Sequence, residues 1–451
     1  MSDPGSNDPE RYPTLTEHGR RMLAFLREHP CAPHFHNQSG NRLTAADVLW
    51  VRAFEEEVRT SSPDWREHRP PGWRDAFVER CFEEVPFFRS LGPPPPRFEE
   101  LPTTSRADLS RDIARFVPDT VPLERLLQFT TSGTTGHPLL VPSHPVVAAS
   151  YLAFHKQALR RFGIALRHGR GQVGVVLVGM QRRCFTYVSV NPTMDESGLA
   201  KLNLHPDDWR HPDDRARYLD ALSPEVITGD PLSLSELLKL PLATRPRALL
   251  STSMALHAAL RHQLEQRFAC PVLDLYSMNE AGPIAAFDAR LGGHVLLQHR
   301  LFVELLDPSG QPVQAGERGE VTLTGGFNFA LPLLRYRTGD QAALRWVGQE
   351  AVLVELQGRP PVRFRTATGT WLNNVEVTHA LQEFALSQFA LHQAADGALT
   401  LRCAGAPAAS RDRIVRTLEA IFGAVPLRLD ADATFEGKVV QYTSDLAEAQ
   451  P

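Results

Sequence analysis

From about residue 110 onward, short apolar runs alternate with segments whose apolar residues recur at helical spacing. Residues 173–178 read VGVVLV, which has the length and composition of a buried strand. Residues 255–268 have the periodicity of a helix, and residues 272–276 that of the strand after it. Strands buried on both faces need helices to cover them. The alternation therefore predicts an α/β fold with helix-covered sheets.

Strand-like segments further along the chain extend this picture. Residues 301–306 and 319–324 are expected to form hairpin strands, with turn residues at 307–310, and to add a hairpin or barrel-like subdomain. Near the N-terminus, helical spacing appears at residues 20–29, 45–60 and 73–84.

Two points in the sequence indicate domain boundaries. Residues 1–20 are polar and are expected to form a loose tail. The sequence GRPP beginning at Gly358 is typical of a boundary. We therefore expect a large domain over residues 21–357 and a small α+β lid domain over residues 358–451.

The bulk composition excludes several classes of protein. Net charge is −4 over 451 residues, with 42% apolar and 22% charged residues, so no nucleic-acid footprint or basic membrane patch is expected. The five cysteines lack C-x-x-C spacing, which indicates reduced thiols and no zinc site. The longest apolar run, residues 173–180, is too short to span a bilayer, and the N-terminus lacks the pattern of a secretory signal. We expect a cytoplasmic globular protein, and the sequence leaves its oligomeric state open.

A run of hydroxyl side chains and glycines lies between two apolar segments, residues 126–129 and 139–141, that are predicted strands. Glycines let a backbone approach a polyanion closely, and hydroxyls can bond phosphate oxygens. The run is not a P-loop, because it lacks the G-K-[ST] ending and no helix obviously follows it. A plain turn is the alternative reading. The residues of this predicted phosphate-binding run are Thr130, Thr131, Ser132, Gly133, Thr134, Thr135 and Gly136.

Further motifs follow this run in a fixed order. They are YSMNEAG at residues 276–282, YRTGD at 336–340, GR at 358–359 and GK at 437–438. The set resembles the adenylate-forming enzymes, the superfamily of acyl-CoA synthetases, adenylation domains and luciferase. LPTTSRADL at 101–109 and VPFFR at 85–89 resemble elements of its phenylacetate-CoA ligase branch. The resemblance runs from about Phe77 to about Lys438. It implies ATP-dependent activation of a carboxylic acid as an acyl-adenylate, with release of pyrophosphate.

The YSMNEAG motif contains a candidate metal ligand and residues expected to line an adenosine pocket. Glu280 is the expected Mg²⁺ ligand, since Mg²⁺ is held by one or two carboxylates plus phosphate oxygens, and a surface ion pair is the alternative. The resemblance implies that Tyr276 packs against adenine, with core filling as the alternative. The other residues expected to line this pocket are Ser251, Ser277, Met278 and Asn279.

The remaining motifs supply the ribose and phosphate contacts. Asp340 is expected to accept hydrogen bonds from the vicinal ribose hydroxyls, although a bare T-G-D is often only a β-turn. The resemblance places Arg359 at the ribose and phosphate. It also implies that Lys438 is the cation that follows the negative charge developing on the carboxylate and the α-phosphate. Lys438, Glu280 and Thr131 are the expected catalytic residues.

An aromatic acid is expected because Phe185 and Tyr187 fall where the branch lines its acyl pocket.

The hinge departs from the family: Pro360 and Pro361 replace the acidic residue that usually follows Gly-Arg, and two prolines should resist a domain swing. Adenylation is thus better supported than transfer to CoA. The expected cofactors are ATP and Mg²⁺, with CoA left open, since a carrier-protein thiol, an amine or a reductase partner is an alternative route. An acyl-AMP binding protein is the second class of function.

Overall fold

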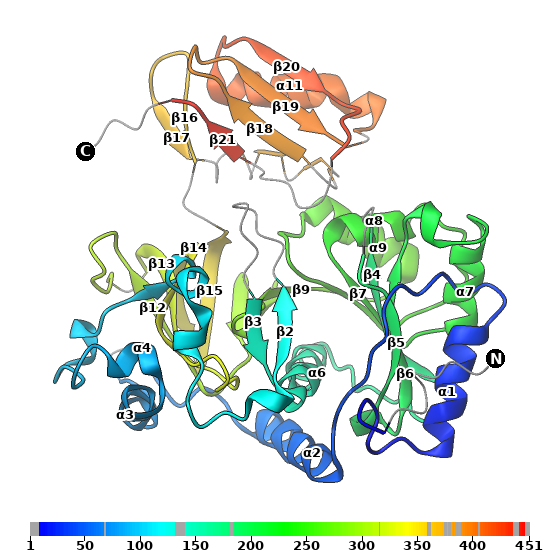
Figure 1. The fold of residues 1–451 in the computed structure, drawn as a ribbon. Helices are drawn as coiled ribbons and strands as arrows, with labels where there is room; N and C mark the ends of the chain where they lie inside the picture. The colour runs from blue at the N-terminus through cyan, green and yellow to red at the C-terminus, as the bar shows by residue number, and fades with distance from the viewer. Residues whose placement is uncertain are drawn as a thin grey trace.

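The protein is represented by a computed structural model (Figure 1). It describes residues 9–66, 69–130, 140–180, 184–314, 316–358, 362–373, 377, 380–381, 383–384, 386, 389–404, 406–435 and 442–446. Within this part of the chain, no helix is both long and apolar enough to cross a membrane.

The predicted alternation forms the parallel half of the large N-terminal part. β4 (Val173–Gly179), β7 (Val226–Gly229), β8 (Ala248–Ser251) and β9 (Val272–Met278) lie side by side in that order and run parallel. The connecting helices are α8 (Pro231–Leu237), between β7 and β8, and α9 (Ala258–Phe268), between β8 and β9. Almost every residue of β4 is buried, as expected for a strand covered on both faces. The predicted α/β class is confirmed.

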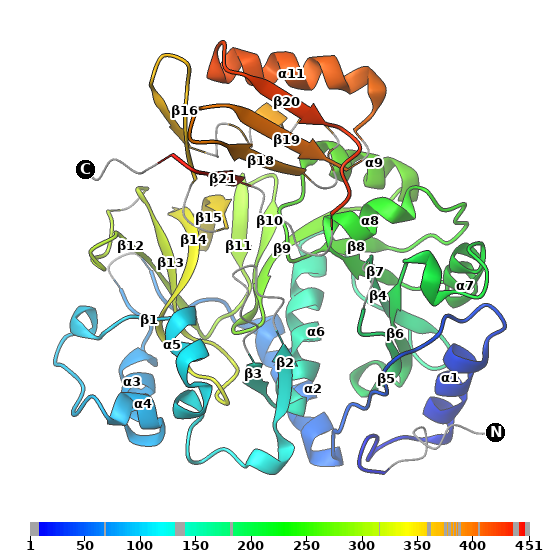
Figure 2. The same cartoon turned by 45° about the horizontal axis from the view of Figure 1, so that its top comes forward.

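On the other side of β4 the sheet continues to its edge. β6 (Ser197–Asn203) runs parallel to β4, and β5 (Tyr187–Asn191) pairs antiparallel with β6. α7 (Asp214–Leu222) connects β6 to β7. α1 (Glu17–Glu28) lies beside β5 and β6 in Figures 1 and 2. α1 begins inside the segment predicted as a loose tail, and Tyr12 is already buried, so the structured part starts earlier than residue 21.

Beyond β9 the sheet becomes antiparallel. Its strands are β10 (Gly282–Asp288), β11 (Gly293–Leu296), β15 (Glu350–Gln357), β14 (Leu333–Val347), β13 (Arg318–Gly325) and β12 (Leu301–Leu306), in this spatial order. The predicted hairpin of β12 and β13 is present, and the amide of Gly310 donates to the carbonyl of Asp307 at 3.0 Å within its turn. β1 (Thr104–Ser105) joins β14 in parallel, with Thr104 opposite Tyr336.

Helices of the N-terminal half support this sheet from below in Figure 1. α2 (Ala45–Thr60) and α3 (Arg74–Glu84) match the predicted segments, and Thr44 and Asp47 cap α2 reciprocally. α4 (Pro86–Arg89) and α5 (Arg106–Arg111) are short. α6 (Pro145–Arg160) was not predicted; it follows the second strand of the Ser/Thr/Gly hairpin and packs along α2. Pro145 starts α6 at a position that proline favours.

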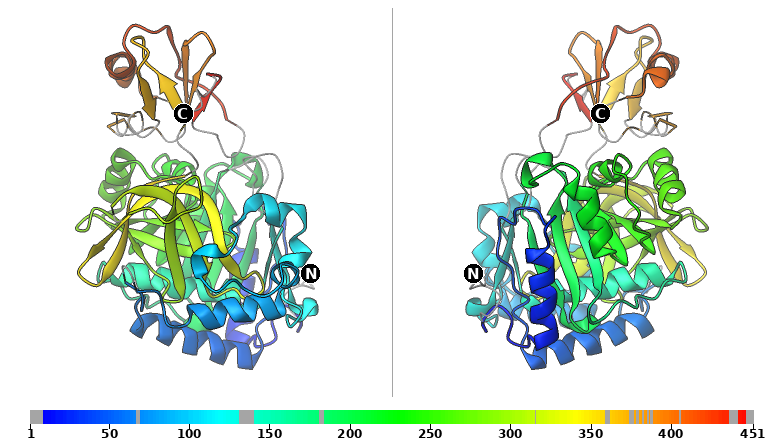
Figure 3. Two further views of the ribbon diagram at one scale, coloured as in Figure 1. Left: turned by 90° about the vertical axis from the view of Figure 1, so that its left-hand side faces the viewer. Right: turned by 90° about the vertical axis from the view of Figure 1, so that its right-hand side faces the viewer.

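The C-terminal part has its own core. β16 (Arg363–Arg365) and β17 (Trp371–Asn373) form a hairpin. β20 (Leu427–Asp430), β19 (Leu399–Cys403), β18 (Phe389–Gln393) and β21 (Tyr442–Ser444) form a separate sheet, and α11 (Ala408–Phe422) packs on it. One apolar cluster contains only residues from Val362 to Tyr442. This separate core favours the boundary at Gly358, which remains a prediction. Figure 3 shows the C-terminal part standing on one end of the large part.

Candidate active site

The Ser/Thr/Gly run connects two paired strands. β2 (Leu127–Thr130) pairs antiparallel with β3 (Leu140–Ser143), with Thr130 opposite Leu140. The flanking strands are therefore as predicted. Thr131, Ser132, Gly133, Thr134, Thr135 and Gly136 lie outside the described residues, and Thr130 is described only by its backbone.

Tyr276 and Asp340 meet although 64 residues separate them in the chain. Tyr276 lies near the end of β9, and its hydroxyl donates to Asp340 Oδ2 at 2.5 Å. Burial, and then the nearby Asp340 carboxylate, raise the pKa of Tyr276 well above its usual value. The phenol is therefore a neutral hydrogen-bond donor throughout the physiological range, and it orients the carboxylate.

A bulge in β14 places Asp340. Arg337 faces Thr322 of β13 and Gln341 faces Glu320, so four residues of β14 span two of β13. Gly339 adopts φ +81°, a left-handed conformation that glycine allows at little cost. Thr338 Oγ1 donates to the carbonyl of Val321 at 2.8 Å and accepts from the Asp340 amide at 3.0 Å. The T-G-D motif is thus a strand bulge that re-aims a side chain.

Glu280 sits in the tight connection between β9 and β10 and is 5% exposed. Its Oε1 accepts from the Tyr336 hydroxyl at 3.2 Å and from Arg106 Nη1 at 3.3 Å. Burial and the neighbouring Glu280 raise the pKa of Tyr336 well above its usual value, so this hydroxyl also stays a donor. Glu280 is therefore a buried carboxylate with partners, and the alternative reading of a surface ion pair does not apply.

Arg106 and Tyr336 were missed as site residues, although both lie in motifs that the sequence singles out. β1 pairs with β14 at Tyr336 and Arg337, so α5 begins with Arg106 next to the Y-R-T-G-D motif. Ser105 and Asp108 cap α5 reciprocally and fix its start. The arginine of the LPTTSRADL motif was the available signal.

The residues around Glu280 fit a Mg²⁺ ion held mainly by a nucleotide. No group of three or more His, Cys, Asp or Glu side chains that could hold a metal occurs among the described residues. Glu280 Oε2 receives no hydrogen bond from the described residues, so this oxygen is available as a ligand. One carboxylate plus phosphate oxygens and water is the usual environment of Mg²⁺, whereas a cage built by the protein alone does not fit here.

The predicted adenosine-pocket residues lie at the carboxyl ends of the parallel strands, where α/β sheets bind ligands. Ser251 ends β8, is fully buried, and its Oγ has no hydrogen-bond partner among the described residues. Ser277 and Met278 end β9, and the carbonyl of Asn279 accepts from the Tyr151 hydroxyl at 3.4 Å. The structure therefore brings Ser251 and the 276–280 motif to one edge of the sheet.

The predicted acyl-pocket aromatics lie elsewhere on that edge. Phe185 and Tyr187 pack edge to face with ring centroids 5.6 Å apart, and Phe185 is 53% exposed. Tyr187 begins β5, which is five strands from β9. At about 4.8 Å per strand, that separation is roughly 24 Å. The structure does not bring this pair next to Glu280.

Arg359, Pro360, Pro361 and Lys438 lie outside the described residues. Gly358, the residue before Arg359, is described and lies close to Asp340. A Cβ placed on Gly358 would lie 3.3 Å from Asp340 Oδ1. The chain therefore enters the predicted hinge directly beside the predicted ribose ligand.

Three of the motifs, at residues 101–109, 276–282 and 336–340, thus meet around Glu280, Tyr276 and Asp340. The AMP-binding enzyme family matches residues 94–330, more than half of the chain. The chain belongs to the AMP-binding enzyme family. Among curated members, the phenylacetate-coenzyme A ligase of Escherichia coli (strain K12) is 26% identical over 299 residues, which cover 59% of this chain. The match spans only 64% of that relative's length.

Solved structures of the same fold include 2-hydroxyisobutyryl-CoA ligase. In its postadenylation state with 2-HIB-AMP, the TM-score is 0.63 at 17% identity, covering 89% of this chain and 90% of that one. In its thioesterification state, the TM-score falls to 0.51 at 17% identity, with 89% and 91% covered.

The two parts of this AMP-binding enzyme meet at an aromatic contact. His257, just before α9, lies with its ring 5.6 Å from that of Phe389 at the start of β18. His257 is buried, and its Nε2 has no hydrogen-bond partner among the described residues. Burial lowers the pKa of His257, while Asp274 acts in the opposite direction.

This contact predicts that docking of the C-terminal part on the large part depends on pH. The depressed pKa means that the docked arrangement favours neutral imidazole. Docking should be fully stable above the free-histidine pKa of about 6.5 and weaken as pH falls through the lower docked-state pKa. We expect the radius of gyration from small-angle X-ray scattering to rise between pH 7 and pH 5. His257→Gln, which cannot become charged, should remove this dependence, and an equal rise in both proteins would contradict the assignment.

Proposed function

We propose that this chain is an AMP-forming ligase that activates a carboxylic acid with ATP. The observation that carries the proposal is the pair of contacts Tyr276–Asp340 and Tyr336–Glu280, which brings two distant motifs into one site. Family membership and the name of the E. coli relative, a phenylacetate-coenzyme A ligase, support it. That name also favours an aromatic acid.

In the proposed reaction, a carboxylate oxygen of the acid attacks the α-phosphorus of ATP. The bond from that phosphorus to the bridging oxygen breaks, and pyrophosphate leaves with the electron pair. Asp340 accepts hydrogen bonds from the ribose hydroxyls, and Tyr276 holds this carboxylate in place while its ring packs against adenine. Bound at Glu280, Mg²⁺ would supply neutralising charge for the triphosphate.

Arg106 has a positioning role in this scheme. Its guanidinium and the Tyr336 hydroxyl both donate to Oε1 of Glu280. Oε2 is then left to bind the metal ion. A carboxylate fixed in this way needs little reorganisation when the nucleotide binds. The hydroxyls of the 130–136 run would bind the phosphates, Arg359 the ribose and phosphate, and Lys438 the reacting carboxylate and α-phosphate.

The acyl acceptor divides the proposal into two versions. CoA is favoured by the names of the relatives, and a carrier protein, an amine or a reductase is favoured by the Pro360–Pro361 sequence at the hinge. Both versions begin with formation of the same acyl-adenylate.

A screen of aryl and alkyl carboxylic acids for pyrophosphate release, with and without CoA, tests the proposal. Acid-dependent release should occur, with aryl acids preferred. Single-turnover measurement of the adenylate and of the CoA thioester then separates the two versions. Absence of acid-dependent pyrophosphate release with every acid would contradict the ligase assignment, and rapid thioester formation would exclude a locked hinge.

Glu280→Gln should raise the Mg²⁺ concentration for half-maximal activity by about 10–100-fold and lower kcat, because an amide is a poorer ligand for a hard cation. Titration of pyrophosphate release with MgCl₂ measures the shift. Glu317→Gln, a charge-matched change at an exposed loop, is the control and should behave like the unmodified enzyme. Unchanged Mg²⁺ dependence in Glu280→Gln would remove this residue from the metal site.

A further inference from the structure

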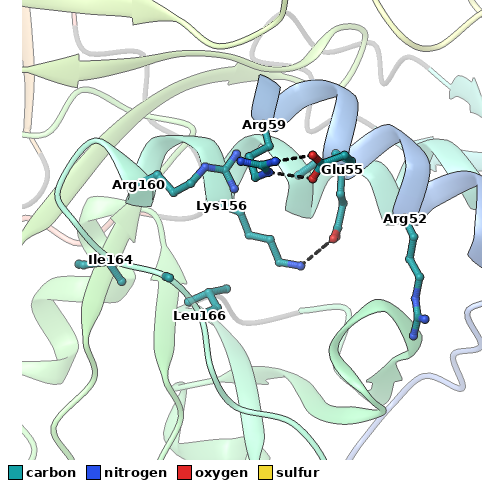
Figure 4. A pocket seen from close by; sticks show the side chains of 10 residues that line it. Arg52, Glu55, Arg59, Lys156, Arg160, Ile164 and Leu166 are labelled. Atoms are coloured by element: carbon teal, nitrogen blue, oxygen red, sulfur yellow. Dashed lines mark hydrogen bonds and ion pairs between the residues drawn. The ribbon is translucent and has the colours of Figure 1, made fainter. Parts of the chain in front are cut away.

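A cavity lies between α2 and α6, and none of the motif residues of the candidate active site lines it (Figure 4). The two helices pack through Phe54 and Phe154, whose rings meet edge to face at 5.7 Å. Beside this contact a cavity of about 280 Å³ opens toward the end of α6 and the residues that follow it. At about 30 Å³ per water molecule, this space corresponds to roughly nine waters.

The walls of the cavity carry more positive than negative charge. Four cationic side chains and two carboxylates line it: Arg52, Arg59, Lys156 and Arg160, with Glu55 and Glu56. Both carboxylates are already paired. Lys156 Nζ lies 2.9 Å from each oxygen of Glu55, and Arg59 Nε donates to Glu56 Oε2 at 2.7 Å.

Arg160 lies near Glu55 and Glu56 but forms no direct ion pair with either of them. Among the described residues it forms no ion pair, and its only side-chain hydrogen bond goes to the carboxamide oxygen of Gln157 at 2.5 Å. Figure 4 shows its guanidinium facing that of Arg59. Burial, and then repulsion by Arg59, lower the pKa of Arg160, while Glu55 and Glu56 act in the opposite direction. An anion between these two guanidinium groups would relieve that repulsion.

The cavity also has an apolar part. Ala153, Ile164 and Leu166 line it next to the charged groups. A ligand that fits both sides has one anionic head and a compact apolar body. One unpaired guanidinium matches a single negative charge, and the planar arginine fork suits a carboxylate.

We propose that the cavity between α2 and α6 binds a small organic carboxylate, with its carboxyl group at Arg160 and its apolar body against Ile164 and Leu166. This site is separate from the nucleotide site and does not depend on the proposed ligase activity.

The probe for this site is 4-bromobenzoate, whose bromine can be located by anomalous scattering. Crystals of the full chain soaked with it should show bromine in the cavity beside Leu166, whatever occupies the active site. In solution, calorimetric titration should show a saturable heat. Arg160→Gln should weaken that binding at least about tenfold, the typical effect of losing a charged hydrogen bond in a partly enclosed site.

Three further measurements keep the proposal testable. Arg217→Gln removes an exposed arginine from α7 and should bind like the unmodified protein. Arg160→Lys keeps the charge without the fork and should bind with intermediate affinity. Phenyl phosphate should bind more weakly than 4-bromobenzoate. Absence of bromine from the cavity, equal binding by Arg160→Gln, density without saturable heat, or tighter binding of phenyl phosphate would each overturn the assignment.

Discussion

Lys438→Ala is expected to slow acyl-adenylate formation by about 10²–10³-fold, the range for losing one preorganised group that stabilises developing charge. The affinity for ATP should hardly change, because this lysine would interact with the reacting carboxylate and α-phosphate rather than with the resting nucleotide. Acid-dependent pyrophosphate release under single-turnover conditions measures the rate, and equilibrium binding of ATP measures the affinity.

Lys239→Ala is the matched control for this variant. Lys239 is an exposed lysine that pairs with Glu236 beside α8, and its loss should leave both measurements unchanged. If Lys438→Ala released pyrophosphate at the normal rate, Lys438 would have no part in the first half-reaction. If it lost ATP binding in proportion to rate, its role would be in binding the ground state.

Arg335→Met is expected to lower the free energy of unfolding of the protein by about 3–5 kcal/mol. Arg335 is 1% exposed, and its Nε and Nη2 each lie 3.3 Å from an oxygen of Glu304. The guanidinium also donates to the carbonyls of Glu99, Leu101 and Gly310. Its removal leaves a buried carboxylate and three carbonyls without their donor. Urea unfolding followed by tryptophan fluorescence measures the change.

The double variant Arg335→Met/Glu304→Leu separates the charge from the packing. Removing both charges abolishes the uncompensated carboxylate, so the double variant should be more stable than Arg335→Met alone. It should remain less stable than the unmodified protein, because the three carbonyls still lack a donor. A loss below about 1 kcal/mol in Arg335→Met would contradict the anchoring role of this ion pair.

The sequence predicted those elements whose signals are local. α2 has the predicted bounds because Thr44 and Asp47 cap it and its apolar residues keep helical spacing. The buried strand β4 and the strand β9 before the YSMNEAG motif were also recognisable from short apolar runs. α6 was missed because buried residues occur on several of its faces, which weakens its periodicity.

The site was predicted as a set of motifs but not as a set of contacts. Arg106 reaches Glu280 across 174 residues of sequence, through the pairing of β1 with β14. Pairing between distant strands depends on register and spatial order, which local patterns do not determine. The same limit applies to Tyr187, because no local pattern indicates that its segment forms the far edge of the sheet.

β14 carries three side chains with separate tasks within six residues: Arg335 in the core ion pair, Tyr336 at Glu280 and Asp340 at Tyr276. Their separations along the strand are set by backbone geometry, and the bulge at Gly339 sets the direction of the last one. Side-chain replacement at one of these positions can alter one contact alone. An inserted or deleted residue between Arg335 and Asp340 would displace the others together, since a shift of one residue turns each side chain to the opposite face. Genetic variation in this segment should therefore consist of substitutions, and length changes should be confined to connections such as the turn at residues 307–310.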